Sequence, residues 1–380
     1  MVEPRVDQED VLKTEELLVN IGPQHPSTHG VLRVVVRTDG EIVRDSKVFI
    51  GYLHRCFEKI AESVPYPQSI PYCDRMDYIA SMNDGLAMCM TIEKLLGVEI
   101  PERAVWVRMI VCELNRIASH LIAVGTYGLD IGAFTPFFYA FREREKILDI
   151  LEKISGGRLL YHYIRVGGQL RDLNAEIIDD IKKFVDQMEY RWPEYNELLS
   201  NNLIFVKRTG NVGVIPADLA IEYGLTGPCL RGSGVRFDLR KDEPYCFYDK
   251  VEFDVPVGEG KMGTVGDCWD RYWVRMLEIR ESCKIILQCL EKLPEGPMMG
   301  KVSKVIRCPK GEVYFRAENP RGELGYYLVS DNKPQAYRFR ARGPSFCNLS
   351  ILGEVARDCL VADVIAIIGS IDIVLGEVDR

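Results

Sequence analysis

Apolar and polar residues alternate along the first part of the chain, a pattern typical of strands with one buried face. Residues 17–50 carry this alternation, and two such runs, at 31–36 and 41–50, flank Asp39 and Gly40. An Asp-Gly pair in this position favours a two-residue type I′ hairpin turn. The pattern therefore predicts a small antiparallel sheet at residues 17–50.

Between residue 51 and about residue 200 the apolar positions recur every three to four residues, as on one face of a helix. We expect Asp74 to cap a helix that ends at Gly97, because Asp accepts hydrogen bonds from free N–H groups and glycine suits a helix end. Pro101 opens the next helix, and another begins near Asn174. The pattern predicts a helical bundle with short connections.

The last part of the chain mixes both patterns. A short helix is expected at 216–223 and a long amphipathic helix at 270–293, strand-like alternation returns at 311–342, and residues 351–375 suit one or two buried helices. The order of these patterns indicates the α+β class, with a β-rich N-terminal part, a central helical bundle and a mixed C-terminal part. We place the domain boundaries at 1–66, 67–300 and 301–380.

Composition and charge narrow the classes of partner. With 47% hydrophobic and 27% charged residues the chain is typical of a folded protein, and its formal net charge of −8 disfavours a nucleic-acid binder. Asp130, Asp363 and Asp372 interrupt the two most apolar stretches, so we expect buried core and no transmembrane segment. Membrane association would then come through a partner.

Twelve cysteines are spread along the chain, and none follows the Cys-x-x-Cys spacing. This disfavours a zinc ribbon, a ferredoxin-like cluster site and a thioredoxin motif. Residues 1–16 are acidic and lack the basic-then-apolar layout of an export signal. We therefore expect reduced thiols packed as small hydrophobic residues, and no metal bound by this chain.

Ionisable residues in unexpected places are the candidates for chemistry. His25 and His29 share a loop rich in proline and glycine at 22–30. Their spacing could hold a metal, but no carboxylate is near in sequence, so imidazoles bonded to the backbone are the simpler interpretation. Residues 75–78 (Arg-Met-Asp-Tyr) are expected at a helix start, where the carboxylate either caps the helix or serves a site. Asp130, among apolar residues, needs a partner such as a protonated histidine.

Common catalytic motifs are absent from the sequence. There is no complete Ser-His-Asp signature, no phosphate-binding loop and no dinucleotide fingerprint. Residues 231–234 (Arg-Gly-Ser-Gly) lack the strand–turn–helix spacing of a nucleotide site, so we interpret them as a loop.

Six contiguous segments together resemble a known family over nearly the whole chain. They are IGPQHPSTHGV (21–31), GYLHRCFEK (51–59), DRMDY (74–78), ELNRIASH (113–120), LDIGAFTPFFYAFRERE (129–145) and GEVDR (376–380). These segments are similar to the D subunit of respiratory complex I, the proton-pumping NADH:quinone oxidoreductase. The resemblance implies a fold related to the large subunit of nickel–iron hydrogenases.

The resemblance also implies a quinone site. His29 and Tyr78 match the pair that hydrogen-bonds the quinone headgroup, and Asp130 matches the carboxylate paired with that histidine. Quinone reduction consumes two electrons and two protons, which a phenol and an imidazolium are suited to donate. The further residues expected to contact the quinone are His25, Thr126 and Val374.

Partners and location follow from the same resemblance. Arg55 and Arg75 match arginines near a [4Fe–4S] cluster that the B subunit of the complex carries, and no prosthetic group is implied for this chain itself. The expected partners are the peripheral-arm subunits B, C, H and I, at the cytoplasmic face of the inner membrane. Enzymatic activity is expected only within that complex.

Two departures from relatives bear on the chemistry. Hydrogenases bind nickel and iron through a Cys-x-x-Cys near each end, but here Val374 and Glu377 stand at the C-terminal thiolate positions, which disfavours hydrogen chemistry. Leu160 stands where many ubiquinone-reducing members have a histidine beside the terminal cluster. We therefore expect a cluster of lower, less pH-dependent potential and a low-potential quinone such as menaquinone.

Two other functions remain open at this point. The chain could be a non-catalytic scaffold that organises neighbouring redox subunits, or its complex could take electrons from ferredoxin or a deazaflavin in place of NADH. Electron entry lies on other subunits, so the sequence of this chain is compatible with each donor.

Overall fold

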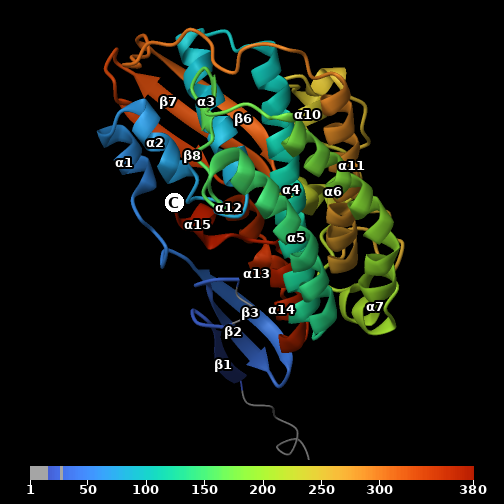
Figure 1. Ribbon diagram of the computed structural model, residues 1–380. Helices are drawn as coiled ribbons and strands as arrows, with labels where there is room; N and C mark the ends of the chain where they lie inside the picture. Colours follow the sequence, from blue (N-terminus) through green and yellow to red (C-terminus); the bar gives the residue numbers. More distant parts are fainter. Residues whose placement is uncertain (1–15, 26–28) are drawn as a thin grey trace, which may run out of the picture.

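A three-stranded antiparallel sheet lies at one end of the molecule (Figure 1). In the computed structural model, which describes residues 16–25 and 29–380, its strands β1 (Glu16–Ile21), β2 (Arg33–Asp39) and β3 (Ile42–Phe49) pair in that order. Alternate residues of β2 are buried, so the predicted sheet with one buried face is confirmed. The acidic segment 1–15 and residues 26–28 of the predicted loop lie outside the described residues.

The hairpin turn lies one residue later than the sequence predicts. Asp39 pairs with Ile42, so the two loop residues are Gly40 and Glu41. Of these two only Gly40 has a positive φ, 59°, which fits the first central position of a type II′ turn. A bulge just before the turn shifts the register by one residue. The predicted hairpin is confirmed, but the Asp39-Gly40 type I′ turn is wrong.

The middle of the chain is a helical bundle, as predicted. Its helices are α1 (Phe57–Ser63), α2 (Tyr66–Cys73), α3 (Ser81–Leu96), α4 (Glu102–Asp130), α5 (Phe134–Ser155), α6 (Ala175–Tyr195) and α11 (Cys268–Glu291). Helix α4 packs against α3, α5 and α11, and most of its residues are buried. The side chain of Asn174 caps α6 and Gly97, at φ 67°, ends α3, both as expected.

The expected cap at Asp74 is wrong. Asp74 closes α2, and α3 begins only at Ser81, after a turn at 74–80. The Asp74 carboxylate instead accepts a hydrogen bond from the backbone N–H of His162 at 2.7 Å. A tertiary partner therefore holds the side chain, and residues 75–78 lie in the turn between two helices and not at a helix start.

Several short elements fill the space around the long helices. They are β4 (Ile164–Arg165), β5 (Gly168–Gln169), η3 (Asn196–Ser200), α7 (Leu203–Thr209), α8 (Ala217–Glu222), α9 (Pro228–Gly232), α10 (Leu239–Asp242) and η4 (Tyr248–Lys250). The expected loop at 231–234 is half wrong, because Arg231 and Gly232 complete α9. Pro228 opens this helix and buried ion pairs hold Arg231.

The C-terminal part combines a second sheet with helices, which confirms the α+β class. Strands β6 (Gly311–Asn319), β7 (Gly322–Ser330) and β8 (Arg338–Arg342) pair antiparallel in that order, and α3 packs against β6 and β7. Four helices follow: α12 (Pro344–Leu349), α13 (Leu352–Val355), α14 (Val361–Ile371) and α15 (Leu375–Asp379). Within residues 16–25 and 29–380, no helix has the length and apolar character needed to cross a membrane.

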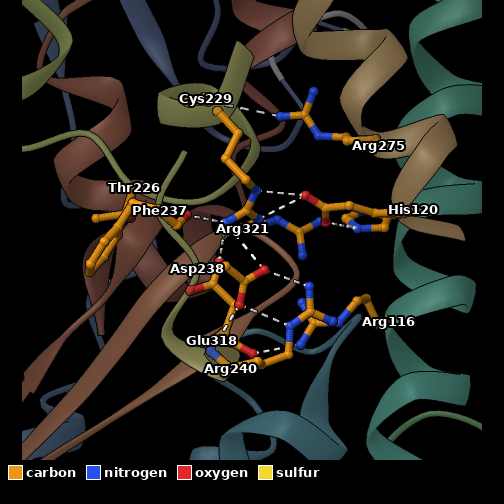
Figure 2. Close-up of polar contacts among 12 residues, drawn as sticks. Arg116, His120, Thr226, Cys229, Phe237, Asp238, Arg240, Arg275, Glu318 and Arg321 are labelled. Atoms are coloured by element: carbon orange, nitrogen blue, oxygen red, sulfur yellow. Dashed lines mark hydrogen bonds and ion pairs between the residues drawn. The ribbon is translucent and has the colours of Figure 1, made fainter. Parts of the chain in front are cut away.

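A network of buried charges joins α4, α9, α10, α11 and β6. Arg231 contacts Glu278 at 2.7 Å and Glu318 at 2.8 Å, while His120 Nε2 lies 2.8 Å from the other oxygen of Glu278. Figure 2 shows His120, Glu318 and Arg240 converging on this network from different elements. Buried charges are tolerated only when they are paired, so the network constrains how these elements meet.

Candidate functional site

A cavity of about 440 Å³ lies where five segments that are distant in sequence meet. The segments are the loop before β2, the turn between α2 and α3, the end of α4 with the first residue of α5, the β6–β7 turn, and the stretch between α14 and α15. The lining residues are His29, Tyr78, Ile79, Ile122, Thr126, Leu129, Asp130, Phe134, Arg321, Asp372, Ile373 and Val374. A largely apolar wall with a few convergent polar groups is typical of a small-molecule site.

The expected contact between His29 and Asp130 is present on this wall. His29 Nε2 lies 2.6 Å from Asp130 Oδ2, and both side chains are largely buried, at 12% and 7% exposed. Asp130 is the last residue of α4 and can be approached by α14 because residue 369 is glycine. A Cβ at Gly369 would lie only 2.9 Å from Asp130 Oδ2. Charge-assisted hydrogen bonds of this length are among the stronger ones in proteins.

Tyr78 lies in the turn between α2 and α3 and lines the same cavity. Burial raises the pKa of its phenol, and the carboxylate of Asp77 adds to that effect. The backbone of Gly376 packs directly on the ring, since a Cβ there would lie 3.2 Å from Tyr78 Cε1. The turn and the C-terminal segment together hold a phenol that stays protonated at neutral pH and can act as a donor.

Arg321 and Asp372 line the cavity as well, although sequence reasoning did not place them at the site. Arg321 Nη2 donates to Asp372 Oδ1 at 3.3 Å and its Nε donates to the backbone oxygen of Asp372 at 2.9 Å. Asp372 has a left-handed backbone, with φ 58°, at the end of α14. A signal was present in the sequence, because Asp372 interrupts an apolar run and a buried carboxylate needs a partner.

The three residues expected to contact a quinone do not all reach this cavity. Thr126, one turn before Asp130 on α4, lines it, and its hydroxyl donates to the backbone oxygen of Ile122 at 2.7 Å. Val374 lines it too. His25 is not among the described residues of the wall and pairs instead with Gly30 across the loop.

Arg55 and Arg75 meet at another part of the surface. Arg55 Nη2 donates to the backbone oxygen of Arg75 at 2.9 Å. Arg75 lines a second cavity, of about 490 Å³, together with Tyr72 and His162. Burial lowers the pKa of His162 to about 4, and the charges of Arg165 and Arg75 act in the same direction. An imidazole therefore lies beside Arg75, although Leu160 occupies the position at which the family resemblance predicts a histidine.

The cysteines form no disulfide, and all twelve are free thiols. In the part of the chain that the structure describes, no three side chains of the types Cys, His, Asp and Glu converge as metal ligands. The polar groups of the cavity lined by His29 and Tyr78 are thus a phenol, a threonine hydroxyl, an imidazole–carboxylate pair and an arginine–carboxylate pair.

The α+β fold thus carries a mostly apolar cavity with paired proton-carrying side chains on its wall, an arrangement typical of small-molecule sites. Comparison with known proteins gives the family. Residues 130–307 and 299–380 match the family described as the respiratory-chain NADH dehydrogenase 49 kDa subunit, and the chain belongs to this family. The predicted resemblance to the D subunit of complex I is confirmed.

Similar proteins match over nearly the full length of the chain. The chain is 55% identical to the D subunit of the NADH-quinone oxidoreductase of Chlorobaculum tepidum, over 99% of this chain and 95% of that protein. It is 54% identical to the corresponding D subunit of Chlorobium luteolum, with 97% and 94% covered. It is also 51% identical to the D subunit numbered 1 of Cytophaga hutchinsonii, with 100% and 99% covered.

Proposed function

We propose that this chain forms the quinone headgroup site of a proton-pumping NADH:quinone oxidoreductase and donates protons during quinone reduction. The observation that carries this proposal is the convergence of Tyr78 with the His29–Asp130 pair on one cavity, the two side chains of the pair being 2.6 Å apart. The names of the relatives, which are quinone oxidoreductase subunits, support the same substrate class.

Proton donation follows from the orientation of the groups. Because His29 Nε2 faces Asp130, Nδ1 is the nitrogen left to donate to a headgroup oxygen. An imidazolium that gives up its Nδ1 proton remains hydrogen-bonded to Asp130 through Nε2–H. Tyr78 donates its phenolic proton to the other headgroup oxygen, so two protons reach the two carbonyl oxygens of one quinone.

The electrons come from outside the chain in this proposal. A [4Fe–4S] cluster on the B subunit supplies them, and Arg55 and Arg75 lie beside this cluster. Subunits C, H and I are the other proposed neighbours of the chain. The exposed guanidinium groups at this surface suit a partner that carries negative charge there. The complex would hold the chain peripherally at the cytoplasmic face of the inner membrane.

The proposed cluster potential gives a test on the intact complex. Leu160 stands at the usual histidine position, and His162, with a pKa of about 4, remains neutral between pH 6 and 8. We therefore expect a midpoint potential that changes little over this range and a low-potential acceptor such as menaquinone. A redox titration that shows a strong pH dependence would contradict both expectations.

Replacing Tyr78 by Phe tests the site itself. The loss of one proton donor should lower quinone reduction by tenfold or more, in line with the 10²–10⁴-fold typical of general acids, while the complex still assembles. Tyr190→Phe, at a tyrosine that is 76% exposed on α6, is the matched control and should behave as the wild type. NADH oxidation with a water-soluble artificial acceptor reports intact electron entry in both variants.

Photolabelling with a quinone analogue separates the proposal from a scaffold role. A headgroup site should be labelled in the 74–80 turn or the loop that carries His29. Wild-type turnover of Tyr78→Phe, together with no labelling at either segment, would instead favour a non-catalytic scaffold. A ferredoxin- or deazaflavin-linked complex would show the same labelling, so the donor is identified by which reductant drives turnover.

A further inference from the structure

We propose that a carboxyl cluster behind the cavity, formed by Asp77, Asp84, Asp372 and Glu377, holds a proton reserve that restores the proton of Tyr78 after each quinone reduction. This inference rests on the proposed function, and it brings in Asp84, Asp372 and Glu377, which sequence reasoning did not connect with Tyr78.

Hydrogen bonds hold two members of the carboxyl cluster on the Arg321 guanidinium and the other two on backbone N–H groups. Arg321 Nη1 donates to Asp77 Oδ2 at 2.8 Å, and its Nη2 donates to Asp372 Oδ1 at 3.3 Å. The backbone N–H of Asp77 donates to Asp84 Oδ2 at 2.8 Å. The backbone N–H of Ser345 donates to Glu377 Oε2 at 2.9 Å. These contacts bring together the 74–80 turn, α3, the β6–β7 turn and the C-terminal segment.

The charges of the cluster do not balance if every carboxyl is ionised. Its four carboxyl groups are each at most 3% exposed. The guanidinium groups in contact with them are Arg321 and Arg275, whose Nε lies 3.7 Å from Asp372 Oδ2. Buried charges without a counter-charge are strongly disfavoured, so the cluster retains protons at neutral pH.

Glu377 is the member best suited to hold a proton. Its side chain is fully buried, and among the described residues no group donates a hydrogen bond to its Oε1. Burial raises the pKa of Glu377 to about 8, and the nearby Asp77 carboxylate acts in the same direction. Burial also raises the pKa values of Asp77 and Asp84 above the usual carboxyl range.

The cluster reaches the cavity at two points. Asp372 and Arg321 lie on the cavity wall with Tyr78, and Asp77 directly precedes Tyr78 in the turn. Asp372 Oδ2 has no hydrogen-bond donor among the described residues, and it is therefore available to accept and pass on a proton. Gly376, whose backbone packs on the Tyr78 ring, directly precedes Glu377.

The proposed step moves one proton and no electrons. Tyr78 breaks its O–H bond when it donates to the quinone oxygen, while the two electrons come from the iron–sulphur donor of the complex. The resulting phenolate forms a new O–H bond with the proton released by Glu377, which passes through the carboxylates bound to Arg321. Glu377 becomes a carboxylate and then takes a proton from water.

The pH dependence depends on all groups that face Glu377. These are Asp77 from the turn, Asp84 from α3, Arg321 from the β6–β7 turn, Tyr326 from β7, and Ser345 and Cys347 from α12. Within this set Glu377 loses its proton as the pH rises through about 8. Multiple-turnover quinone reduction should therefore fall over that range in the wild type.

Glu377→Gln in the intact complex tests the reserve, because the amide keeps the shape of the side chain but cannot titrate. We expect the rate of multiple-turnover quinone reduction to drop about tenfold at pH 7. The decrease in rate that the wild type shows near pH 8 should be absent from the variant. The first turnover and the KM for quinone should stay near the wild-type values, because Tyr78 starts protonated. Glu354→Gln, at an exposed glutamate on α13, is the control and should keep the wild-type rate and pH profile.

A second measurement does not depend on how the variant folds. In the wild-type complex, infrared difference spectra during turnover should show a transient loss of a protonated carboxyl band. Spectra without this loss would contradict the proposed proton reserve. If Tyr78→Phe is inactive but Glu377→Gln keeps the wild-type rate and pH profile, the reserve is wrong and the quinone site stands. If Tyr78→Phe itself turns over normally, the proposed function is contradicted, and the proton reserve, which rests on it, is contradicted too.

Discussion

Tyr78, His29 and Asp130 illustrate what single residues reveal in a sequence. Asp130 stood out because a carboxylate among apolar residues needs a partner, and the structure places His29 Nε2 at 2.6 Å from it. Arg321 gave no such signal, since its partners Asp77 and Asp372 lie 244 and 51 positions away. A residue whose role depends on distant partners cannot be assigned from local pattern alone.

The His29–Asp130 pair gives a prediction at this scale. His29→Gln and Asp130→Asn should each lower quinone reduction, and the double variant should lose much less than the product of the two losses. The reason is that either substitution removes the same interaction, with coupling energies of about 0.5–3 kcal/mol for residues in contact. Rates of the two single variants and the double variant in the assembled complex give the coupling, and simple additivity would remove the pair from the mechanism.

Helices and strands could be predicted where local signals decide them. The cap at Asn174 and the glycine at the end of α3 depend on neighbouring backbone groups, and both are present. Asp74 does not cap α3 as expected, because its carboxylate accepts a hydrogen bond from the backbone N–H of His162, far along the chain. Arg231 lies in α9 and not in the expected loop, and the ion pairs with Glu278 and Glu318 that hold it there join residues too far apart in sequence to be predicted.

The buried ion network predicts a contrast between two arginines. Arg231→Leu leaves Glu278 and Glu318 buried without their main counter-charge, which should lower the free energy of unfolding by about 3–5 kcal/mol. Arg280→Leu on α11 removes an exposed pair with Glu189, for which about 0–1 kcal/mol is expected, and a cation–π contact with Trp192, for which about 0.5–1 kcal/mol is expected. Thermal unfolding of the assembled complex measures both, and equal shifts would contradict the structural role of the network.

At the scale of the whole molecule, the sequence indicated the order of the parts but not how they meet. The sheet, helical bundle and mixed C-terminal part follow from hydrophobic periodicity. The cavity, by contrast, joins the loop before β2, the α2–α3 turn, the end of α4, the β6–β7 turn and the segment after α14. No local pattern encodes a meeting of segments hundreds of residues apart, and only the resemblance to a family pointed to it.

A ligand that spans this cavity should stabilise these segments together. A quinone analogue at 100 times its Kd adds about 2.7 kcal/mol to the native state. Hydrogen exchange of the assembled complex should therefore slow around Tyr78, Asp130 and Asp372 at the same analogue concentration. Protection confined to one of these segments would show that the analogue binds elsewhere.

Two polar residues of the cavity have left-handed backbones, His29 at φ 51° and Asp372 at φ 58°. Such conformations cost on the order of 1–3 kcal/mol for residues other than glycine. Glycine at either position would relieve this strain, but it would also remove the imidazole or the carboxylate and leave Asp130 or Arg321 largely buried without that partner. The contacts of the site thus offset the strain of its own backbone, and engineering for durability should leave both positions untouched.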